Sequence, residues 1–134
     1  MRNVKACQPT GLLVIDKPAG LTSHDVVDRV RQIVGSKAGH AGTLDPQATG
    51  VLLVCLGAAT RLTQFLQRHD KVYEGVIKLG WATDTYDAEG APLADPVTPP
   101  PLSREEVQKA LDLFVGVFKQ TPPAYSAKKV RGQP

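Results

Sequence analysis

The sequence predicts a single domain that mixes β-strands with α-helices. Two apolar runs, residues 11–16 and 51–56, are too short for helices and are bounded by turn formers, which is typical of buried strands. Around them, other apolar residues recur at helical spacing, and one later stretch alternates with a period of two. Strands and helices follow one another at irregular intervals. The pattern therefore leaves the α/β and α+β classes both open.

The first half of the chain is predicted to contain a strand, a helix, a loop and a second strand. Residues 1–10 lack periodicity and are expected to form a flexible N-terminus, and the strand at 11–16 ends in a Lys-Pro-Ala-Gly turn. Thr22 or Ser23 can cap a helix that Gly35 ends. The helix has one apolar face, made of Val26, Val27, Val30, Ile33 and Val34. Residues 36–50 are glycine-rich and polar, and we expect an ordered loop there.

The second half is predicted to add two helices and two strands. Residues 58–67 are predicted to form a helix with Leu62, Phe65 and Leu66 on one side, and residues 71–80 alternate as in a strand. Residues 81–90 are expected to form a loop. Residues 91–101 hold five of the eleven prolines and are expected to be extended. A Ser-x-x-Glu capping box at 103–106 begins a further helix. A strand could occupy residues 115–120. The basic segment that follows is too rich in proline to form a regular element.

Composition is that of an ordinary globular protein. At 134 residues, with 42% hydrophobic and 22% charged residues, the chain is long enough to bury roughly two thirds of its unfolded surface. The net charge of +3 permits a polyanionic partner without requiring one. No apolar run is long enough to span a membrane and no signal-peptide pattern is present, so we expect the cytoplasm. Cys7 and Cys55 fit no metal spacing and are predicted to be free thiols without a catalytic part.

Asp45 is the first candidate for chemistry. The proline that follows it excludes helical backbone, so its carboxylate is displayed from extended chain just before the strand at 51–56. Such a carboxylate can be a nucleophile, a general base, a metal ligand or a turn former, and composition alone favours the turn former. A metal is not predicted, because His40 is the nearest candidate ligand and no third one has a recognisable spacing. No nucleotide-phosphate motif is present either.

Tyr73 and several lysines are weaker candidates. Tyr73 reads either as a core tyrosine or as a surface on which a nucleic-acid base stacks. Lys17, after the first strand, could meet a phosphate or a core carboxylate, although an isolated lysine is usually exposed. Lys128, Lys129 and Arg131 could contact phosphates or could form a solvated basic face.

Several ordered motifs carry a family resemblance. Residues 39–52 read Gly-His-Ala-Gly-Thr-Leu-Asp-Pro-Gln-Ala-Thr-Gly-Val-Leu, and residues 12–27 read Leu-Leu-Val-Ile-Asp-Lys-Pro-Ala-Gly-Leu-Thr-Ser-His-Asp-Val-Val. Further matching segments are Lys-Val-Tyr-Glu-Gly-Val-Ile-Lys-Leu-Gly at 71–80, Thr-Asp-Thr-Tyr-Asp-Ala-Glu-Gly at 83–90 and Pro-Pro-Ala-Tyr-Ser-Ala-Lys-Lys at 122–129. Over residues 11–134 the chain closely resembles the bacterial TruB-type tRNA pseudouridine synthases.

The resemblance implies an α+β fold with a mixed, mainly antiparallel sheet flanked by helices. It also implies isomerisation of the uridine at position 55 in the T loop of tRNA, without cofactor or metal. Asp45 matches the aspartate that attacks the flipped-out nucleotide, Tyr73 the tyrosine that stacks on the base, and His40 a histidine that helps to hold the RNA loop open. Thr43 lies in the same motif and, with Lys17, Lys128 and Lys129, is a possible RNA or structural contact.

The resemblance also implies that the chain is the N-terminal portion of a catalytic domain. In the family this domain continues past the point matching Pro134, with a Lys-Gly-Thr-Tyr-Ile-Arg type motif and usually a C-terminal RNA-binding domain. Neither is present here. We therefore expect an incomplete sheet and little activity from residues 1–134 alone. Two alternatives stay open: a related synthase that uses a guide RNA, and a non-catalytic RNA-binding or chaperoning fragment of the same fold.

Overall fold

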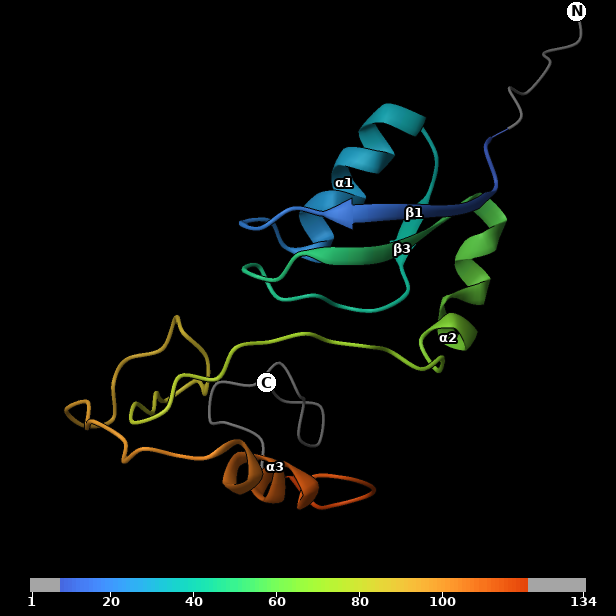
Figure 1. The fold of residues 1–134 in the computed structure, drawn as a ribbon. Coiled ribbons are helices and arrows are strands. Elements are labelled where there is room, and N and C mark those ends of the chain that lie inside the picture. Colours follow the sequence, from blue (N-terminus) through green and yellow to red (C-terminus); the bar gives the residue numbers. More distant parts are fainter. Residues whose placement is uncertain (1–7, 121–134) are drawn as a thin grey trace, which may run out of the picture. The chain divides into compact units, whose positions relative to one another are not determined.

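The computed structural model describes residues 8–120, and the chain divides into two compact units, Met1–Tyr73 and Glu74–Pro134 (Figure 1). The first unit holds every described strand, and the second holds one described helix. The predictions for Cys7, the first residues of the N-terminus, Lys128, Lys129 and Arg131 fall outside the described residues. None of the described helices is long and apolar enough to cross a membrane.

The first unit is built on a three-stranded antiparallel sheet in the order β1-β3-β2 (Figure 1). The predicted strands are confirmed as β1 (Gly11–Lys17) and β3 (Gly50–Leu56), which pair from Gly11 opposite Leu56 to Lys17 opposite Gly50. The third strand, β2 (Ala38–His40), was not predicted, because a three-residue Ala-Gly-His run carries no strand pattern. It forms because its backbone pairs with the last residues of β3.

Helix α1 (Ser23–Val34) covers one face of the sheet (Figure 1). Thr22 caps it: the Thr22 side chain accepts from the Asp25 N–H, and the Asp25 carboxylate accepts from the Thr22 N–H. The helix ends as predicted at Gly35, whose φ of 64° is in the left-handed region. The buried core lies between helix and sheet and is made of Val26, Val27, Val30, Ala38, Leu52, Val54 and Leu56.

Two apolar expectations for the first unit are wrong. Ile33, predicted on the core face of α1, is 84% exposed, whereas Val34 beside it packs against the core, so Ile33 lies outside the buried stripe of the helix. The predicted helix at 58–67 is divided into a 3₁₀ helix, η1 (Gly57–Leu62), and a single α-helical turn, α2 (Thr63–Leu66). Neither piece has a side-chain N-cap, and Leu62 and Phe65 stay more than half exposed, so little packing stabilises a longer helix.

The second unit contains the predicted capped helix but neither of the predicted strands. Helix α3 (Arg104–Asp112) begins at a Ser103–Glu106 capping box, while its apolar face, which includes Val107 and Leu111, is exposed. Residues 71–80 form no strand, and Val76 is 99% exposed. A strand requires a neighbour for its backbone hydrogen bonds, and no described strand pairs with this segment. Residues 115–120 are also irregular.

The predicted loop and the proline-rich connection are confirmed. Residues 81–90 form a loop that is closed by an isolated bridge between Thr83 and Pro92. A Cβ on Gly90 would clash with the side chains of Thr83, Asp84 and Thr85, so a glycine suits the tight closure of this loop. No helix or strand is assigned within 91–101.

Candidate functional site

The candidate site is the loop that connects β2 to β3, residues 41–49, together with the cavity beside it. The Ala41 N–H donates to the Leu53 carbonyl at 2.8 Å, which joins the start of the loop to the central strand. The loop ends at Gly50, whose φ of 127° favours glycine, directly opposite Lys17 in the β1–β3 register. Both ends of the loop are therefore fixed by the sheet.

Two hydrogen-bonded anchors hold the middle of this loop. On one side of Asp45, the Ser23 hydroxyl donates to the Leu44 carbonyl at 3.1 Å and accepts from the Leu44 N–H at 2.9 Å. On the other side, the Pro46 carbonyl accepts from the Gly20 N–H at 2.8 Å and from the Lys17 ammonium at 3.2 Å. The segment between β1 and α1 thus fixes the backbone on both sides of Asp45.

Lys17 is fully buried, contrary to the usual exposure of an isolated lysine. Its ammonium donates to the carbonyls of Pro18, Leu21 and Pro46 at 3.0, 2.7 and 3.2 Å. Three carbonyl oxygens match the three N–H donors of an ammonium, and this full complement offsets the cost of burying the charge. Lys17 therefore makes a structural contact beneath the loop and does not face solvent.

Asp45 is exposed in the middle of the loop. Its backbone carbonyl accepts from the Ala48 N–H at 3.1 Å, which closes a turn through Pro46 and Gln47. Among the residues that the structure describes, no donor hydrogen-bonds its carboxylate. Asp45 is thus a turn former through its backbone, while its carboxylate remains available to a partner.

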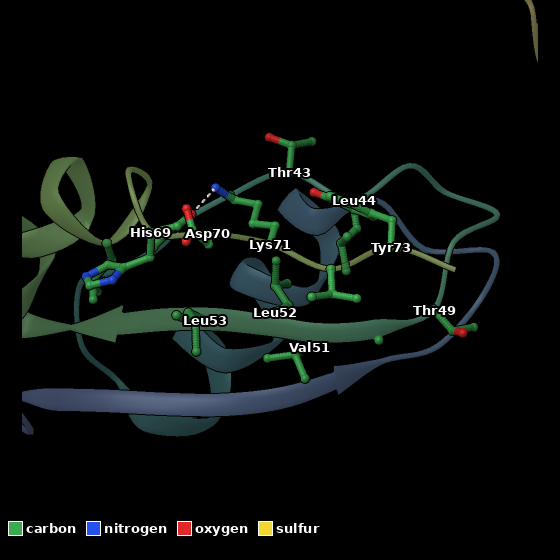
Figure 2. Close-up of a pocket in the computed structure, with 15 residues that line it drawn as sticks. Thr43, Leu44, Thr49, Val51, Leu52, Leu53, His69, Asp70, Lys71 and Tyr73 are labelled. Atoms are coloured by element: carbon green, nitrogen blue, oxygen red, sulfur yellow. Dashed lines mark hydrogen bonds between the residues drawn. The ribbon is translucent and has the colours of Figure 1, made fainter. Parts of the chain in front are cut away.

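A cavity of about 380 Å³ lies beside the loop, within the first unit. Its wall combines β3 with the loop residues Thr43 and Leu44 and with the segment from His69 to Tyr73. Figure 2 shows His69 at one end of the cavity and Tyr73 at the other, with Lys71 between them. Asp45 does not line this cavity, although Leu44, its neighbour in sequence, does.

The other predicted site residues of the first unit surround this cavity or its loop. Tyr73 lines the cavity with 69% of its surface exposed, so it is not a core tyrosine. Thr43 is exposed on the same wall. His40, the last residue of β2, is half-buried, and its Nδ1 faces the Gly42 carbonyl at 2.5 Å. Because a carbonyl only accepts, Nδ1 carries a proton in this contact and Nε2 is left to interact elsewhere.

Two residues of this region were not predicted from the sequence. Ser23 was considered only as a helix cap, yet Thr22 serves that role and leaves the Ser23 hydroxyl to the loop. The sequence does hold a signal for this contact. Thr22 and Ser23 are adjacent hydroxyl residues at the start of the helix, and only one of them can occupy the N-cap, so the other is available to a different partner. Lys71 lines the cavity, and its ammonium donates to the carbonyls of Gln67 and His69, in the segment that follows α2.

The described part of the chain holds one cysteine and no cluster of candidate metal ligands. Cys55 is a free, fully buried thiol, and burial raises its pKa, so it remains protonated and packs as a small apolar residue. Within residues 8–120, no group of three or more His, Cys, Asp and Glu side chains is placed to hold a metal ion.

Residues 30–134, which include the whole loop, match the family of TruB pseudouridylate synthases, in its N-terminal domain. The chain belongs to this family. The small antiparallel sheet with its helices is consistent with an incomplete α+β fold of that kind.

Bacterial members of the TruB family are similar to nearly all of this chain. The tRNA pseudouridine synthase B of Solibacter usitatus is 52% identical over 124 residues, which cover 92% of this chain and 42% of that protein. The enzyme of the same name from Geobacillus kaustophilus is 49% identical over 92% of this chain and 44% of that protein. The chain therefore spans less than half the length of these relatives.

One solved structure is similar over most of the chain. It is the crystal structure of a Cbf5-Nop10-Gar1 complex, in which the matching chain is 29% identical with a TM-score of 0.59. The match covers 91% of this chain and 31% of that chain.

Proposed function

We propose that this chain is the N-terminal part of the catalytic domain of a tRNA pseudouridine synthase that acts on the T-loop uridine. One observation carries the proposal: a stretch about 50% identical to bacterial tRNA pseudouridine synthases B includes a carboxylate held on fixed backbone next to an open cavity. Attack on a nucleotide needs a carboxylate whose position is fixed before the substrate arrives, and it needs space beside that carboxylate for the base.

The proposed reaction begins with a uridine that has left its stack, because the bond to be broken is inaccessible within stacked RNA. The Asp45 carboxylate attacks the glycosidic carbon of the sugar, and an ester bond to Asp45 forms as the glycosidic carbon–nitrogen bond breaks. The uracil turns, and one of its carbons displaces the carboxylate from the sugar, so the ester bond breaks and Asp45 is regenerated. That carbon then loses its proton, and the released nitrogen gains one. No atom is gained or lost overall, so the reaction requires no external nucleophile and no oxidant.

Tyr73 and His40 receive roles in RNA binding under this proposal. The exposed ring of Tyr73 offers a stacking surface at the cavity, which suits a base that has lost its neighbours in the RNA. The Nε2 atom of His40 is free to contact the opened RNA loop, since Nδ1 is occupied by Gly42. Lys128 and Lys129 are proposed phosphate contacts on their sequence alone.

The test is to incubate the protein expressed from its natural gene with a T-arm RNA, without a guide RNA, and to measure pseudouridine. We expect turnover by the wild-type protein. Asp45→Asn should abolish turnover and leave RNA affinity unchanged, because the amide keeps the shape of the side chain and loses its nucleophilicity. Asp70→Asn serves as the matched control, since Asp70 lines the cavity from its other side, and it should retain turnover.

A second candidate is a non-catalytic RNA-binding or chaperoning fragment. The observation that favours it is that the exposed ring of Tyr73 lines the cavity whereas Asp45 does not. The same experiment separates the two functions, because a pure binder would show RNA affinity and no pseudouridine in wild type. Turnover that appears only when a guide RNA is added would instead indicate the guided class of synthase.

A further inference from the structure

The Ser23 hydroxyl is the one buried polar group of helix α1 that the helix itself does not use. Ser23 is the first residue of α1 and is 2% exposed. The helix N-terminus is already completed by the reciprocal hydrogen bonds between Thr22 and Asp25. A buried hydroxyl without a partner would be costly, and here both of its hydrogen-bonding capacities are directed at Leu44 in the loop.

The contact between Ser23 and Leu44 is reciprocal, and it uses both backbone hydrogen-bonding groups of Leu44. The Ser23 hydroxyl donates its proton to the Leu44 carbonyl and accepts from the Leu44 N–H, at 3.1 and 2.9 Å. The Leu44 carbonyl belongs to the same peptide plane as the nitrogen of Asp45, and that plane is rigid. Fixing the carbonyl therefore fixes the direction in which the chain enters Asp45.

The exit from Asp45 is fixed independently. The Pro46 carbonyl is held by Gly20 and Lys17, and the Asp45 carbonyl by Ala48. With both flanking peptides fixed, the remaining freedom of Asp45 is rotation within its side chain. The Leu44 side chain adds a further restraint, because it packs against the core between α1 and the sheet.

We propose that Ser23 is a positioning residue that sets the approach of the Asp45 carboxylate to the nucleotide by holding the Leu44 peptide. This inference rests on the proposed function of Asp45. It predicts that loss of the Ser23 hydroxyl slows the chemical step and leaves RNA binding intact, because binding contacts are spread over the loop and cavity while attack depends on one carboxylate. A displacement of about 1 Å at a reacting group can cost about 100-fold in rate.

The experiment compares three variants of the protein expressed from its natural gene. Ser23→Ala removes the hydroxyl, and Ser23→Thr restores it. Val30→Ala is the control for general destabilisation, since Val30 is buried on the same helix and has no polar atom that could hold the loop. For each protein we would measure the melting temperature, the Kd for a T-arm RNA and the single-turnover rate at saturating protein.

We expect Ser23→Ala to lower the single-turnover rate by about 10- to 100-fold with little change in Kd. Ser23→Thr should recover most of the rate. Val30→Ala should lower the melting temperature at least as much as Ser23→Ala and keep the wild-type rate. Equal rates in Ser23→Ala and wild type would overturn the inference, as would an equal loss of rate in Val30→Ala.

Amide hydrogen exchange supplies a readout that does not depend on activity. The Leu44 amide should exchange faster in Ser23→Ala, whereas the Ala41 amide, which is bonded to Leu53, should keep its wild-type protection. Unchanged exchange at Leu44 would show that the hydroxyl does not hold the loop and would overturn the inference. Absence of turnover in wild type would overturn the proposed function and this inference with it. Turnover in wild type together with an equal rate in Ser23→Ala would overturn this inference alone, so the two failures are distinguishable.

Discussion

At the scale of single residues, the loop around Asp45 depends on groups that face inward. The exposed carboxylate was found from the sequence, because a residue before proline must leave the helical region. Of its two supports, Lys17 is predicted from the sequence only as a possible RNA or structural contact, and Ser23 only as a helix cap. Their partners within the loop are backbone groups of Pro46 and Leu44, 29 and 21 positions away. Almost every residue has such groups, so side-chain identities carry no signal of the contact.

Lys17 offers a test of stability at this scale. Lys17→Met keeps the apolar stem and removes the ammonium, which leaves the Pro18 and Leu21 carbonyls without this donor. We expect the free energy of unfolding to fall by about 2 kcal/mol, as for buried polar groups that lose a charged partner. Urea denaturation measures the change, with Lys37→Met at an exposed position as the control. A Lys17→Met variant as stable as wild type would show that the stem alone suffices.

At the scale of secondary-structure elements, the sequence correctly predicts the helices that begin at a capping box, and the strands and helix whose apolar face is buried. Helix α1 has both, and helix α3 has its capping box, so each begins where the sequence indicates. Strand β2 and the division of the helix at 57–66 were missed, because pairing with β3 and the lack of packing decide them. The alternation at 71–80 predicted a strand that requires a partner not found among the described strands.

The capping box of α1 predicts a dependence of stability on pH. A side-chain hydrogen bond from Thr22, and then one from its backbone, hold the pKa of Asp25 below its ordinary value of 3.8. The unfolded chain therefore binds a proton more readily than the folded one, and the stabilisation is present above about pH 3.8 and is lost as the pH falls below it.

Comparison with Asp25→Asn isolates this group from the carboxylates of Asp87 and Glu106, whose pKa values hydrogen bonds also lower. Urea denaturation measures the free energy of unfolding of both proteins from neutral to acidic pH. The excess stability of wild type over Asp25→Asn should be constant near neutral pH and should shrink as the pH falls below about 3.8. A difference that stays constant through the whole range would contradict the role of the Asp25 charge.

At the scale of the whole molecule, one face of the sheet is covered by a helix and the other is covered only in part within the described residues. Helix α1 packs on the first face, while Val14 and Val51 on the second are 69% and 68% exposed (Figure 1). Single-sequence patterns indicate that a strand has an apolar face, but they do not indicate what covers it. Nor did they indicate a division into two units near Tyr73.

This arrangement bears on the activity of residues 1–134 alone. We expect residues 1–134, expressed alone and without the further length that the bacterial relatives have, to form little or no pseudouridine in a T-arm RNA. The reason is that residues 71–80 lack strand pairing and one face of the sheet is only partly covered. The measurement is a comparison with a full-length bacterial relative at equal concentration. Robust turnover by residues 1–134 would show that the first unit and its loop suffice for catalysis.

The β1–β3 register has a consequence for the evolution of this region. Pairing runs without interruption from Gly11 opposite Leu56 to Lys17 opposite Gly50, so the residue that ends β1 is aligned with the end of the Asp45 loop. Because Gly20 and Ser23 hold the loop from the segment that follows β1, an inserted or deleted residue in either segment would misalign the two. Lineages that change the length of one segment should therefore show a compensating change in the other.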